Sequence, residues 1–478
     1  MSATKNPESF ISLNLPPAQI ENLKALQYSQ MTPIQAKALP AALAGQDLIA
    51  QARTGSGKTA AFGIALLCKL NPRDFGTQAL IMCPTRELCT QVATEIRRLA
   101  RYLPNVKVAV LCGGQALGPQ IASLAHGAHI VVGTPGRLKD HVNKQTLKLE
   151  RVSTLVLDEA DRMLDMGFSE DIEEIIGQTS PDRQTLLFSA TFPDNIETLS
   201  AQYQKDALHI AVESVAAETT IAQHYYLCGT KEEGHQRSDA LLKLLQYFAP
   251  QSCVVFCNTR QSTIEMAQHL SDAGIVAMAL QGEMEQRERD QVLIQFRNGS
   301  CQVLVATDVA ARGLDIEQLP MVINAELPRD LEVYTHRIGR TGRAGNEGLA
   351  LSLYFENERF RVEALQKRED NVGSVTHANI DSLPAQNNLA TSATKQTIHI
   401  AGGRKNKIRP GDILGALTAD GGIPGSAIGR IDILDFASFV AIDISDIAQA
   451  IAQLESRKIK GQKFKVRRLH TIATRSRR

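Results

Sequence analysis

Short apolar runs recur along the chain, and each is followed by a stretch in which apolar residues return with helical spacing. The first series of these runs lies at 47–52, 79–83, 106–111, 130–133, 154–158 and 185–189. After a polar stretch at 213–220, a second series follows at 254–257, 276–280, 303–307, 321–324 and 349–353. Strands of a parallel sheet are apolar throughout, because helices cover both faces of the sheet. The pattern therefore predicts two α/β domains in tandem, each built on a parallel sheet.

The pattern changes after residue 370. Residues 371–395 are rich in Asn, Ser, Thr and Ala, a composition that predicts a flexible linker. The next apolar runs predict a small α+β domain of order βαββαβ, in which Pro410 starts the first helix and Ser445 caps the second. Its expected strands lie at 397–401, 428–434, 439–444 and 464–469. We therefore place the domains at 1–212, 213–370 and 396–470, with the linker at 371–395 and a basic tail at 471–478.

The composition fits a globular protein, because hydrophobic residues make up 43% of the chain. The eight cysteines fall largely inside apolar runs and lack metal-ligand spacing, so we expect small buried residues in a reducing compartment. The N-terminus has no apolar signal segment, and no apolar run approaches the roughly 20 residues that span a bilayer. These features favour a soluble cytoplasmic protein with no membrane partner.

The charge is divided unevenly along the chain, although its total is only +1. Residues 396–478 hold fifteen Lys and Arg against seven Asp and Glu, which is a net charge of +8 and leaves −7 for residues 1–395. A basic domain on an acidic body indicates an anionic partner for that domain. A solvated basic surface without a partner fits the composition equally well.

The strongest single motif follows the first predicted strand and opens a helix, which is the setting of a phosphate-binding loop. Gly55 and Gly57 allow backbone N–H groups to wrap around phosphate oxygens. Lys58 is expected to reach the β- and γ-phosphates, and the Thr59 hydroxyl to bind Mg²⁺. The motif predicts binding of ATP with Mg²⁺ by the whole segment: Ala52, Arg53, Thr54, Gly55, Ser56, Gly57, Lys58 and Thr59.

Two acids end the predicted strand at 154–158, about a hundred residues after this loop. Asp158 is placed to hold Mg²⁺ through water, and Glu159 to orient and polarise the water that attacks ATP. Acids at a strand end are common, so this pair indicates a function only because a phosphate-binding loop precedes it. We therefore expect Lys58, Asp158 and Glu159 to be catalytic.

With these residues the chain resembles the DEAD-box RNA helicases, whose name is spelled by residues 158–161, and the match extends over 10–355. The resemblance implies two RecA-like P-loop domains in tandem. It further implies that Phe10 stacks on the adenine base and that Gln35 reads it, although Gln27 stands where the family has glycine. Asp315 is implied to bind the ribose, and Arg340 and Arg343 to act as catalytic arginine fingers from the second domain.

The resemblance also assigns residues to RNA and to coupling. The implied RNA contacts of the two helicase domains are Pro84, Thr85, Arg86, Gly114, Thr134, Pro135, Gly136, Arg137, Gln286, Arg289 and Thr307. The residues implied to couple ATP hydrolysis to strand separation are Asp161, Ser189, Thr191 and His336. From the chemistry, we infer that ATP and RNA each favour closure of a cleft between the domains, because coupling between two ligands is reciprocal.

The C-terminal domain has the element order of an RNA-recognition motif. Its segments 407–417 and 458–461 resemble the C-terminal domain of the DbpA subfamily of bacterial DEAD-box helicases. That resemblance implies binding of a 23S ribosomal RNA hairpin and a role in assembly of the large (50S) subunit, by a monomer. The basic side chains expected to bind RNA are Arg404, Lys405, Lys407, Arg409, Lys460 and Lys463. Phe436 and Phe439 either stack on bases, as such domains do, or belong to the core.

Two alternative functions share the same ATP motifs. One is an ATP-dependent clamp that holds RNA without unwinding it. The other is a general or cold-stress helicase without specificity for ribosomal RNA. A metabolic kinase with a phosphate-binding loop is disfavoured by the arginine motif at 336–343.

Overall fold

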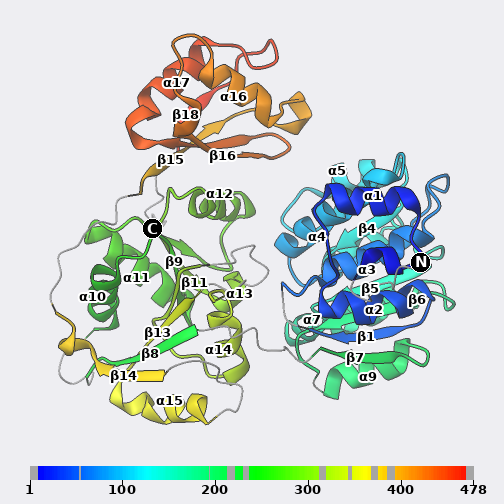
Figure 1. Ribbon diagram of the computed structural model, residues 1–478, viewed down its shortest axis with the longest axis horizontal. Helices are drawn as coiled ribbons and strands as arrows, with labels where there is room; N and C mark the ends of the chain where they lie inside the picture. The colour runs from blue at the N-terminus through cyan, green and yellow to red at the C-terminus, as the bar shows by residue number, and fades with distance from the viewer. Residues whose placement is uncertain are drawn as a thin grey trace, which may run out of the picture. The chain divides into compact units, whose positions relative to one another are not determined.

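The computed structural model describes residues 9–52, 55–192, 194–212, 221–229, 236–311, 319–342, 347–367, 375–384 and 393–469. These residues divide into two compact units, whose boundary lies near residue 216 (Figure 1). The first unit holds one parallel sheet, and the second holds another parallel sheet together with a smaller antiparallel sheet. No helix among the described residues is long and apolar enough to span a bilayer.

The first unit is a seven-stranded parallel sheet of order β3-β4-β2-β5-β6-β1-β7, with helices in the connections. Its strands are β1 (Leu48–Gln51), β2 (Ala79–Met82), β3 (Val108–Leu111), β4 (Ile130–Gly133), β5 (Thr154–Asp158), β6 (Gln184–Ser189) and β7 (Leu208–Ala211). Its helices are α1 (Pro17–Ala25), α2 (Pro33–Leu43), α3 (Lys58–Lys69), α4 (Arg86–Leu99), α5 (Leu117–Leu124), α6 (Pro135–Asn143), α7 (Ala160–Asp165), α8 (Ser169–Gly177) and α9 (Asp194–Tyr203), preceded by a 3₁₀ turn at Phe10–Ser12.

The second unit begins with a parallel sheet of order β10-β11-β9-β12-β13-β8-β14. Its strands are β8 (Ile221–Leu227), β9 (Cys253–Cys257), β10 (Ala277–Leu280), β11 (Val303–Thr307), β12 (Met321–Asn324), β13 (Gly348–Tyr354) and β14 (Val375–Asn379). Its helices are α10 (Arg237–Phe248), α11 (Arg260–Asp272), α12 (Gln286–Arg297), α13 (Asp308–Ala311), α14 (Leu331–Ile338) and α15 (Arg359–Gln366). The prediction of two parallel-sheet domains is confirmed.

Both sheets are buried where the sequence is apolar throughout. Every residue of β2, β4, β5 and β6 is buried, as is every residue of β9, β10, β11 and β12. Seven of the eight cysteines are buried, and burial raises the pKa of thiols such as those of Cys83 and Cys228. Such protonated thiols behave as small apolar groups, as the sequence predicts.

The linker prediction for 371–395 is wrong over part of its length. Val375–Asn379 forms β14, which pairs in parallel with β8, and a 3₁₀ turn at Ile380–Ser382 follows it. The Ile380 side chain is 3% exposed and belongs to the hydrophobic core of the second domain. Most side chains of β14 are exposed, so the strand is held by its backbone pairing and carries no apolar run. The remaining linker residues lie largely outside the described part of the chain, as does the tail at 471–478.

The C-terminal domain is a four-stranded antiparallel sheet of order β16-β17-β15-β18 with two helices, and it confirms the predicted βαββαβ order. Its elements are β15 (Lys395–Ile400), α16 (Pro410–Thr418), β16 (Ile428–Ile433), β17 (Ser438–Asp443), α17 (Ile447–Ser456) and β18 (Val466–Arg468). The core packs the helices on the sheet face that carries Ile398, Ile400 and Val440. Ser445 does not cap α17, because its hydroxyl bonds to the Asp446 side chain and Asp446 occupies the N-cap.

The other face of this small sheet packs against α12 of the second helicase domain. Phe439, in β17, clusters with Ile294 of α12 and with Leu469, and its side chain is 2% exposed. Beside this cluster, the Thr397 hydroxyl lies 2.8 Å from the Ser300 hydroxyl and accepts from Asn298 Nδ2 at 3.3 Å. The sheet face that RNA-recognition motifs offer to bases is therefore occupied in this unit by the protein itself.

Candidate nucleotide and RNA site

The strand order of the first sheet sorts the predicted site residues into two neighbouring groups. The ATP motifs follow β1, β5 and β6, which are adjacent in the sheet, and the first-domain RNA motifs follow β3, β4 and β2. In an open parallel sheet, ligands bind at the carboxyl ends of the strands. The carboxyl ends of the strands therefore present both groups of residues side by side.

The phosphate-binding loop leads from β1 into α3. Gly55 and Gly57 adopt left-handed backbone with φ of +82° and +92°, as a loop wrapped around phosphate requires. A side chain at Gly57 would place its Cβ 2.4 Å from Gln35 Nε2. Lys58 is buried, and its Nζ donates to the Ala52 carbonyl at 2.9 Å. Ser56 and Thr59 complete the described part of the loop, while Arg53 and Thr54 lie outside it.

Gln35 joins the predicted adenine site to this loop. Its Nε2 donates to the Gly57 carbonyl at 3.1 Å, and its Oε1 accepts from the Thr32 backbone at 2.9 Å. Phe10 is buried edge-on against Tyr28, with ring centroids 6.1 Å apart, and both line a cavity of about 190 Å³. Gln27, which stands where the family has glycine, has φ of +65°, so the structure shows why glycine suits that position.

Asp158 ends β5 as a buried carboxylate that lacks a full set of partners. Its side chain is 2% exposed, and its Oδ1 has no hydrogen-bond partner among the described residues. Burial raises the pKa of Asp158 to about 6; the positive charge of Lys58 opposes the rise, and the Glu159 carboxylate adds to it. A divalent cation would satisfy both the free oxygen and the unfavourable charge, so the residues fit the Mg²⁺ that the motif predicts.

Glu159 is held in an uncommon conformation. Its φ of +55° is left-handed backbone, which costs a residue with a side chain on the order of 1 kcal/mol. Its buried carboxylate accepts from Arg162 Nη1 at 2.9 Å in an ion pair that is itself buried. Arg162 was not among the residues predicted from the sequence, although its spacing of three residues from Glu159 on a helix start was a usable signal.

Asp161 ties the same segment to the loop after β6. Its Oδ2 accepts from the Thr191 hydroxyl at 2.9 Å and from the backbone N–H groups of Ala190 and Thr191 at 3.2 and 3.0 Å. Burial alone would raise the pKa of Asp161, but these hydrogen bonds outweigh it and hold the pKa below its usual value. Ser189 is buried beside them, and its carbonyl accepts from the Ala52 backbone at 3.0 Å.

The first-domain RNA motifs are helix starts and turns at the carboxyl ends of β2, β3 and β4. Thr85 caps α4 by accepting from the Leu88 backbone at 3.3 Å, after Pro84 and before Arg86. Gly114 has φ of +70° in the loop after β3. Thr134, Pro135 and Gly136 open α6, from which Arg137 donates to the Gln115 carbonyl at 3.0 Å. The structure thus joins two of these motifs, the loop after β3 and the start of α6, through one arginine.

The second domain gathers its predicted RNA residues around the end of β11. Thr307 ends that strand, and its hydroxyl accepts from the Ala310 backbone at 3.4 Å. Arg289 of α12 donates to the Ala310 carbonyl, and Gln286, one turn earlier, donates to Asp290 at 2.8 Å. His336 is half-buried on α14, and Arg340 beyond that helix is 7% exposed. Asp315 and Arg343 lie outside the described residues.

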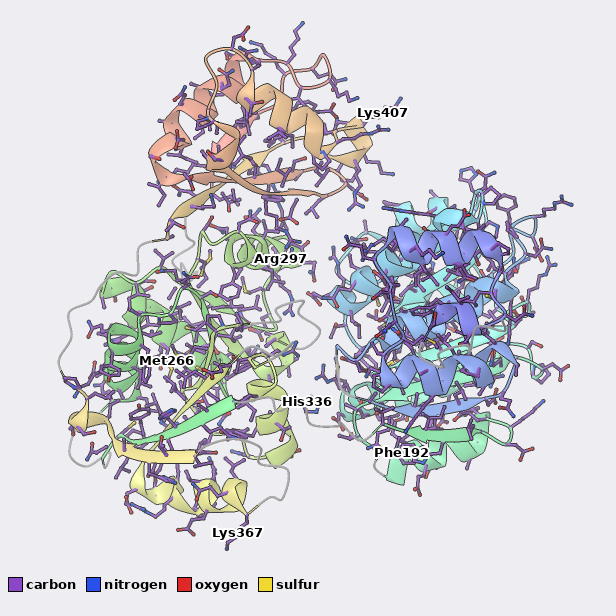
Figure 2. The ribbon with its side chains drawn as sticks, viewed as in Figure 1. Phe192, Met266, Arg297, His336, Lys367 and Lys407 are labelled. Carbon is purple, nitrogen blue, oxygen red and sulfur yellow. The ribbon has the colours of Figure 1, made fainter. Side chains whose placement is uncertain are left out.

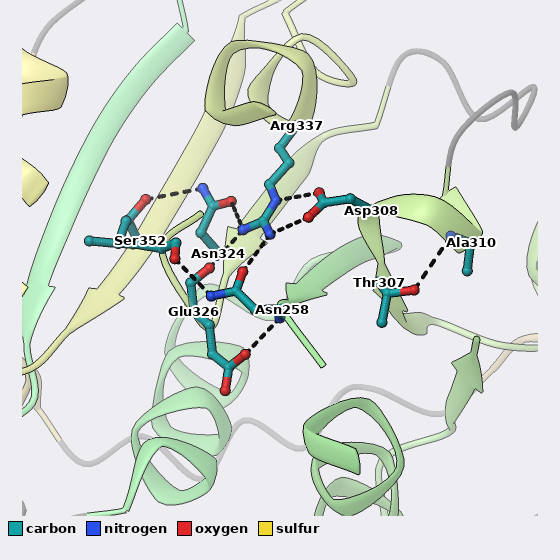
Figure 3. A network of polar contacts seen from close by, with 9 residues as sticks. Asn258, Thr307, Asp308, Ala310, Asn324, Glu326, Arg337 and Ser352 are labelled. Atoms are coloured by element: carbon teal, nitrogen blue, oxygen red, sulfur yellow. Dashed lines mark hydrogen bonds and ion pairs between the residues drawn. The ribbon is translucent and has the colours of Figure 1, made fainter. Parts of the chain in front are cut away.

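Arg337, which was not among the residues predicted from the sequence, is the centre of a polar network in this domain (Figure 3). Its side chain is 1% exposed and pairs with both oxygens of Asp308, at 2.6 and 2.7 Å. It also donates to Asn258 Oδ1 at 2.8 Å and to the Glu326 carbonyl at 2.6 Å. One side chain therefore holds together the loops after β9, β11 and β12.

The predicted basic residues of the C-terminal domain are all exposed: Arg404, Lys405, Lys407, Arg409, Lys460 and Lys463. Lys407 has φ of +60° and points away from the body of the domain (Figure 2). Lys460 lies 3.4 Å from a carboxylate oxygen of Asp412 in the first turn of α16, the helix that the 404–409 loop leads into. The basic residues of the 404–409 loop and Lys460 therefore lie together at the start of α16, as one basic surface.

His399, on the docked sheet face, makes this part of the unit sensitive to acid. Burial and the charges of Arg467 and Arg287 lower the pKa of His399 to about 4, and its Nδ1 has no described partner. Between pH 6.5 and 4 the unfolded chain binds a proton that the folded ring does not bind. Stability is therefore lost as pH falls through that window, by up to about 3 kcal/mol.

We expect hydrogen exchange of β15 and β17, corrected for its intrinsic pH dependence, to accelerate from pH 6.5 to 4. The His399→Gln variant should lack this acceleration, so the wild type and the variant are compared at each pH. Equal pH profiles for the wild type and the variant would contradict the assignment to His399.

Three family models match the chain along its length. The model of the DEAD/DEAH box helicase matches residues 32–199, and that of the helicase conserved C-terminal domain matches residues 236–345. The model of the DbpA RNA binding domain matches residues 397–468. Each match overlaps a different one of the three sheets described above.

Full-length relatives and solved structures agree with these matches. The chain is 50% identical over 463 residues to the ATP-dependent RNA helicase DbpA of Escherichia coli (strain K12), which covers 96% of this chain and 99% of that protein. It is 38% identical over 467 residues to the protein of the same name from Bacillus subtilis (strain 168), covering 93% of this chain and 96% of that protein. The structure titled S. cerevisiae Dbp5 bound to RNA and ADP BeF3 is similar with a TM-score of 0.69 at 30% identity, over 78% of this chain and 96% of that chain.

Proposed function

Because the chain belongs to the DEAD-box family of ATP-dependent RNA helicases, and within it to the DbpA type, we propose that it unwinds 23S ribosomal RNA locally during assembly of the 50S subunit in the cytoplasm. The observation that carries this proposal is the exposed basic surface at the start of α16, on a domain separate from the ATP motifs. Such a surface binds phosphates and can hold a structured RNA while the helicase domains act on a duplex nearby.

For ATP chemistry, we assign roles by what each residue of the first unit contacts. Lys58 exchanges its bond to the Ala52 carbonyl for the β- and γ-phosphates, and the glycines of the loop offer backbone N–H donors. Thr59 and Asp158 would hold Mg²⁺, which neutralises charge on the transferred phosphoryl group. Glu159, fixed by Arg162, orients the attacking water.

We propose that coupling to RNA passes through Asp161. Its side chain accepts from the Ala190 and Thr191 backbone, so movement of the segment that carries Glu159 is transmitted to the loop after β6. In the second domain, Arg340 and Arg343 complete the ATP site on closure, while Thr307, Gln286 and Arg289 grip the RNA backbone. Because ATP and RNA favour the same closed state, each is expected to strengthen binding of the other.

The test compares ATP turnover with 23S ribosomal RNA and with a random-sequence RNA of equal length. The full chain is expected to be stimulated more strongly, and at lower RNA concentration, by 23S ribosomal RNA. Equal stimulation by both RNAs would refute the specificity and favour a general helicase. A strand-displacement assay on a short duplex beside the ribosomal segment then separates an unwinding enzyme from a clamp, which hydrolyses ATP or binds without separating strands.

A further inference from the structure

The C-terminal sheet cannot offer its outer face to RNA bases while it is docked on α12. Phe439, His399 and Thr397 are 2%, 6% and 0% exposed, and the first two rings meet edge to face at 5.2 Å. Ile294 and Ser300 of the second helicase domain cover that face. Any aromatic platform for a base in this domain must therefore lie outside the docked face.

Phe436 is such an aromatic residue. It lies at the tip of the β16–β17 hairpin with 73% of its surface exposed. The tip is held in place, because Leu434 N–H donates to the Ala437 carbonyl at 2.8 Å and both residues pack against the cluster of Ile294 and Phe439. A large apolar ring is thus presented to solvent from a fixed backbone, although burying it would gain about 2 kcal/mol.

The loop at 404–409, which carries four of the predicted basic residues, lies directly against this hairpin tip. Arg404 N–H donates to the Leu434 carbonyl at 2.8 Å, and Lys405 N–H donates to the Asp435 carbonyl at 2.9 Å. A Cβ at Gly403 would lie 2.2 Å from the Leu434 carbonyl oxygen, so only glycine allows the two backbones to approach so closely. The loop therefore brings two exposed basic residues to the hairpin tip that carries the exposed ring, and Arg404 Nε lies 3.5 Å from a carboxylate oxygen of Asp435, the residue before Phe436.

We propose that Phe436 stacks on an unpaired base of the bound RNA, while Arg404 and Lys405 hold the adjoining phosphates. This inference rests on the proposed function and adds to it a defined nucleotide subsite. Stacking on one ring accepts any base, and basic side chains hold its backbone, a combination that suits single-stranded RNA. Bases inside a perfect duplex are not available to the ring, so the subsite takes its nucleotide from a loop, a bulge or an end.

The absence of tryptophan from this chain gives a direct optical test. The Phe436→Trp variant carries a single tryptophan at the proposed subsite, and Phe360→Trp carries one at a matched position in α15, where Phe360 is 63% exposed beside Arg361. A 23S ribosomal RNA transcript is expected to quench the fluorescence of Phe436→Trp and not that of Phe360→Trp. A fully paired RNA duplex should quench neither.

Affinity provides the second measurement. Phe436→Ala should weaken binding of the 23S transcript about tenfold, while Phe436→Tyr and Phe360→Ala should bind as the wild type does. Unchanged affinity of Phe436→Ala, or absence of quenching in Phe436→Trp while the transcript still stimulates ATP turnover, would overturn the stacking proposal and leave the proposed function standing. If the transcript stimulates ATP turnover no better than random RNA in the wild type, the proposed function fails and the subsite fails with it.

Discussion

Replacement of Asp158 by asparagine is expected to lower ATP turnover at least about a hundredfold while leaving the free protein as stable as the wild type, or more stable. The carboxylate is buried and one of its oxygens has no described partner, so its charge is unfavourable without a cation. A pKa of about 6 means that the ionised group costs the free protein about 3 kcal/mol at neutral pH. Asparagine removes that cost, together with the charge that would hold Mg²⁺.

Replacement of a functional carboxylate lowers turnover without lowering stability, whereas replacement of a structural carboxylate lowers stability. Asp47 is the matched control, because it is also buried but its oxygens accept from the Thr185 and Lys205 backbones, both at 2.8 Å. The Asp47→Asn variant should lose about 1–3 kcal/mol of stability and keep ATP turnover while folded. Thermal unfolding without nucleotide and steady-state ATP hydrolysis measure the two effects. An Asp158→Asn protein that melts earlier than the wild type and still turns over ATP would refute the assignment.

The strands at the centres of the parallel sheets could be predicted because helices cover both their faces. Their short apolar runs, each followed by a stretch of helical spacing, favour buried strands. Two of the edge strands, β7 and β14, were missed, because most of their side chains are exposed and backbone pairing holds them without a buried run. The composition of 371–395 resembles a linker for this reason, although a strand crosses it. β8, whose buried and part-buried residues largely alternate, was missed as well.

In the candidate site, too, some residues could be predicted from the sequence and others could not. The places of Gly57, Lys58 and Asp158 in the loop after β1 and at the end of β5 could be predicted, because a phosphate-binding motif calls for those residue types at fixed places after a strand. Arg162 and Arg337 were missed, because an arginine gains its role from acids and carbonyls that only the fold brings to it. Phe436 and Phe439 show the limit most directly. Only the packing against α12 decides that the second ring is buried and the first exposed.

Replacement of Arg337 by methionine is expected to destabilise the second helicase domain by up to about 3 kcal/mol, because the arginine is buried while the side chain of its partner Asp308 is 24% exposed. Methionine fills much of the volume but leaves Asp308, Asn258 Oδ1 and the Glu326 carbonyl without their donor. The loss falls on the loops after β9, β11 and β12, which carry or adjoin the proposed RNA residues. RNA-stimulated ATP turnover should therefore fall as well.

The measurement is hydrogen exchange of the full chain, with the strands of the first unit as internal reference. Peptides from β11 and β12 should exchange faster in Arg337→Met. Arg337→Lys should give a smaller effect, because lysine keeps the charge but lacks the planar donors that meet both Asp308 oxygens. The exposed pair of Arg359 and Glu356 supplies the control, since Arg359→Ala should leave the exchange pattern nearly unchanged. If β11 exchanges in Arg337→Met at the same rate as in the wild type, the network is a consequence of the folded loops and does not stabilise them.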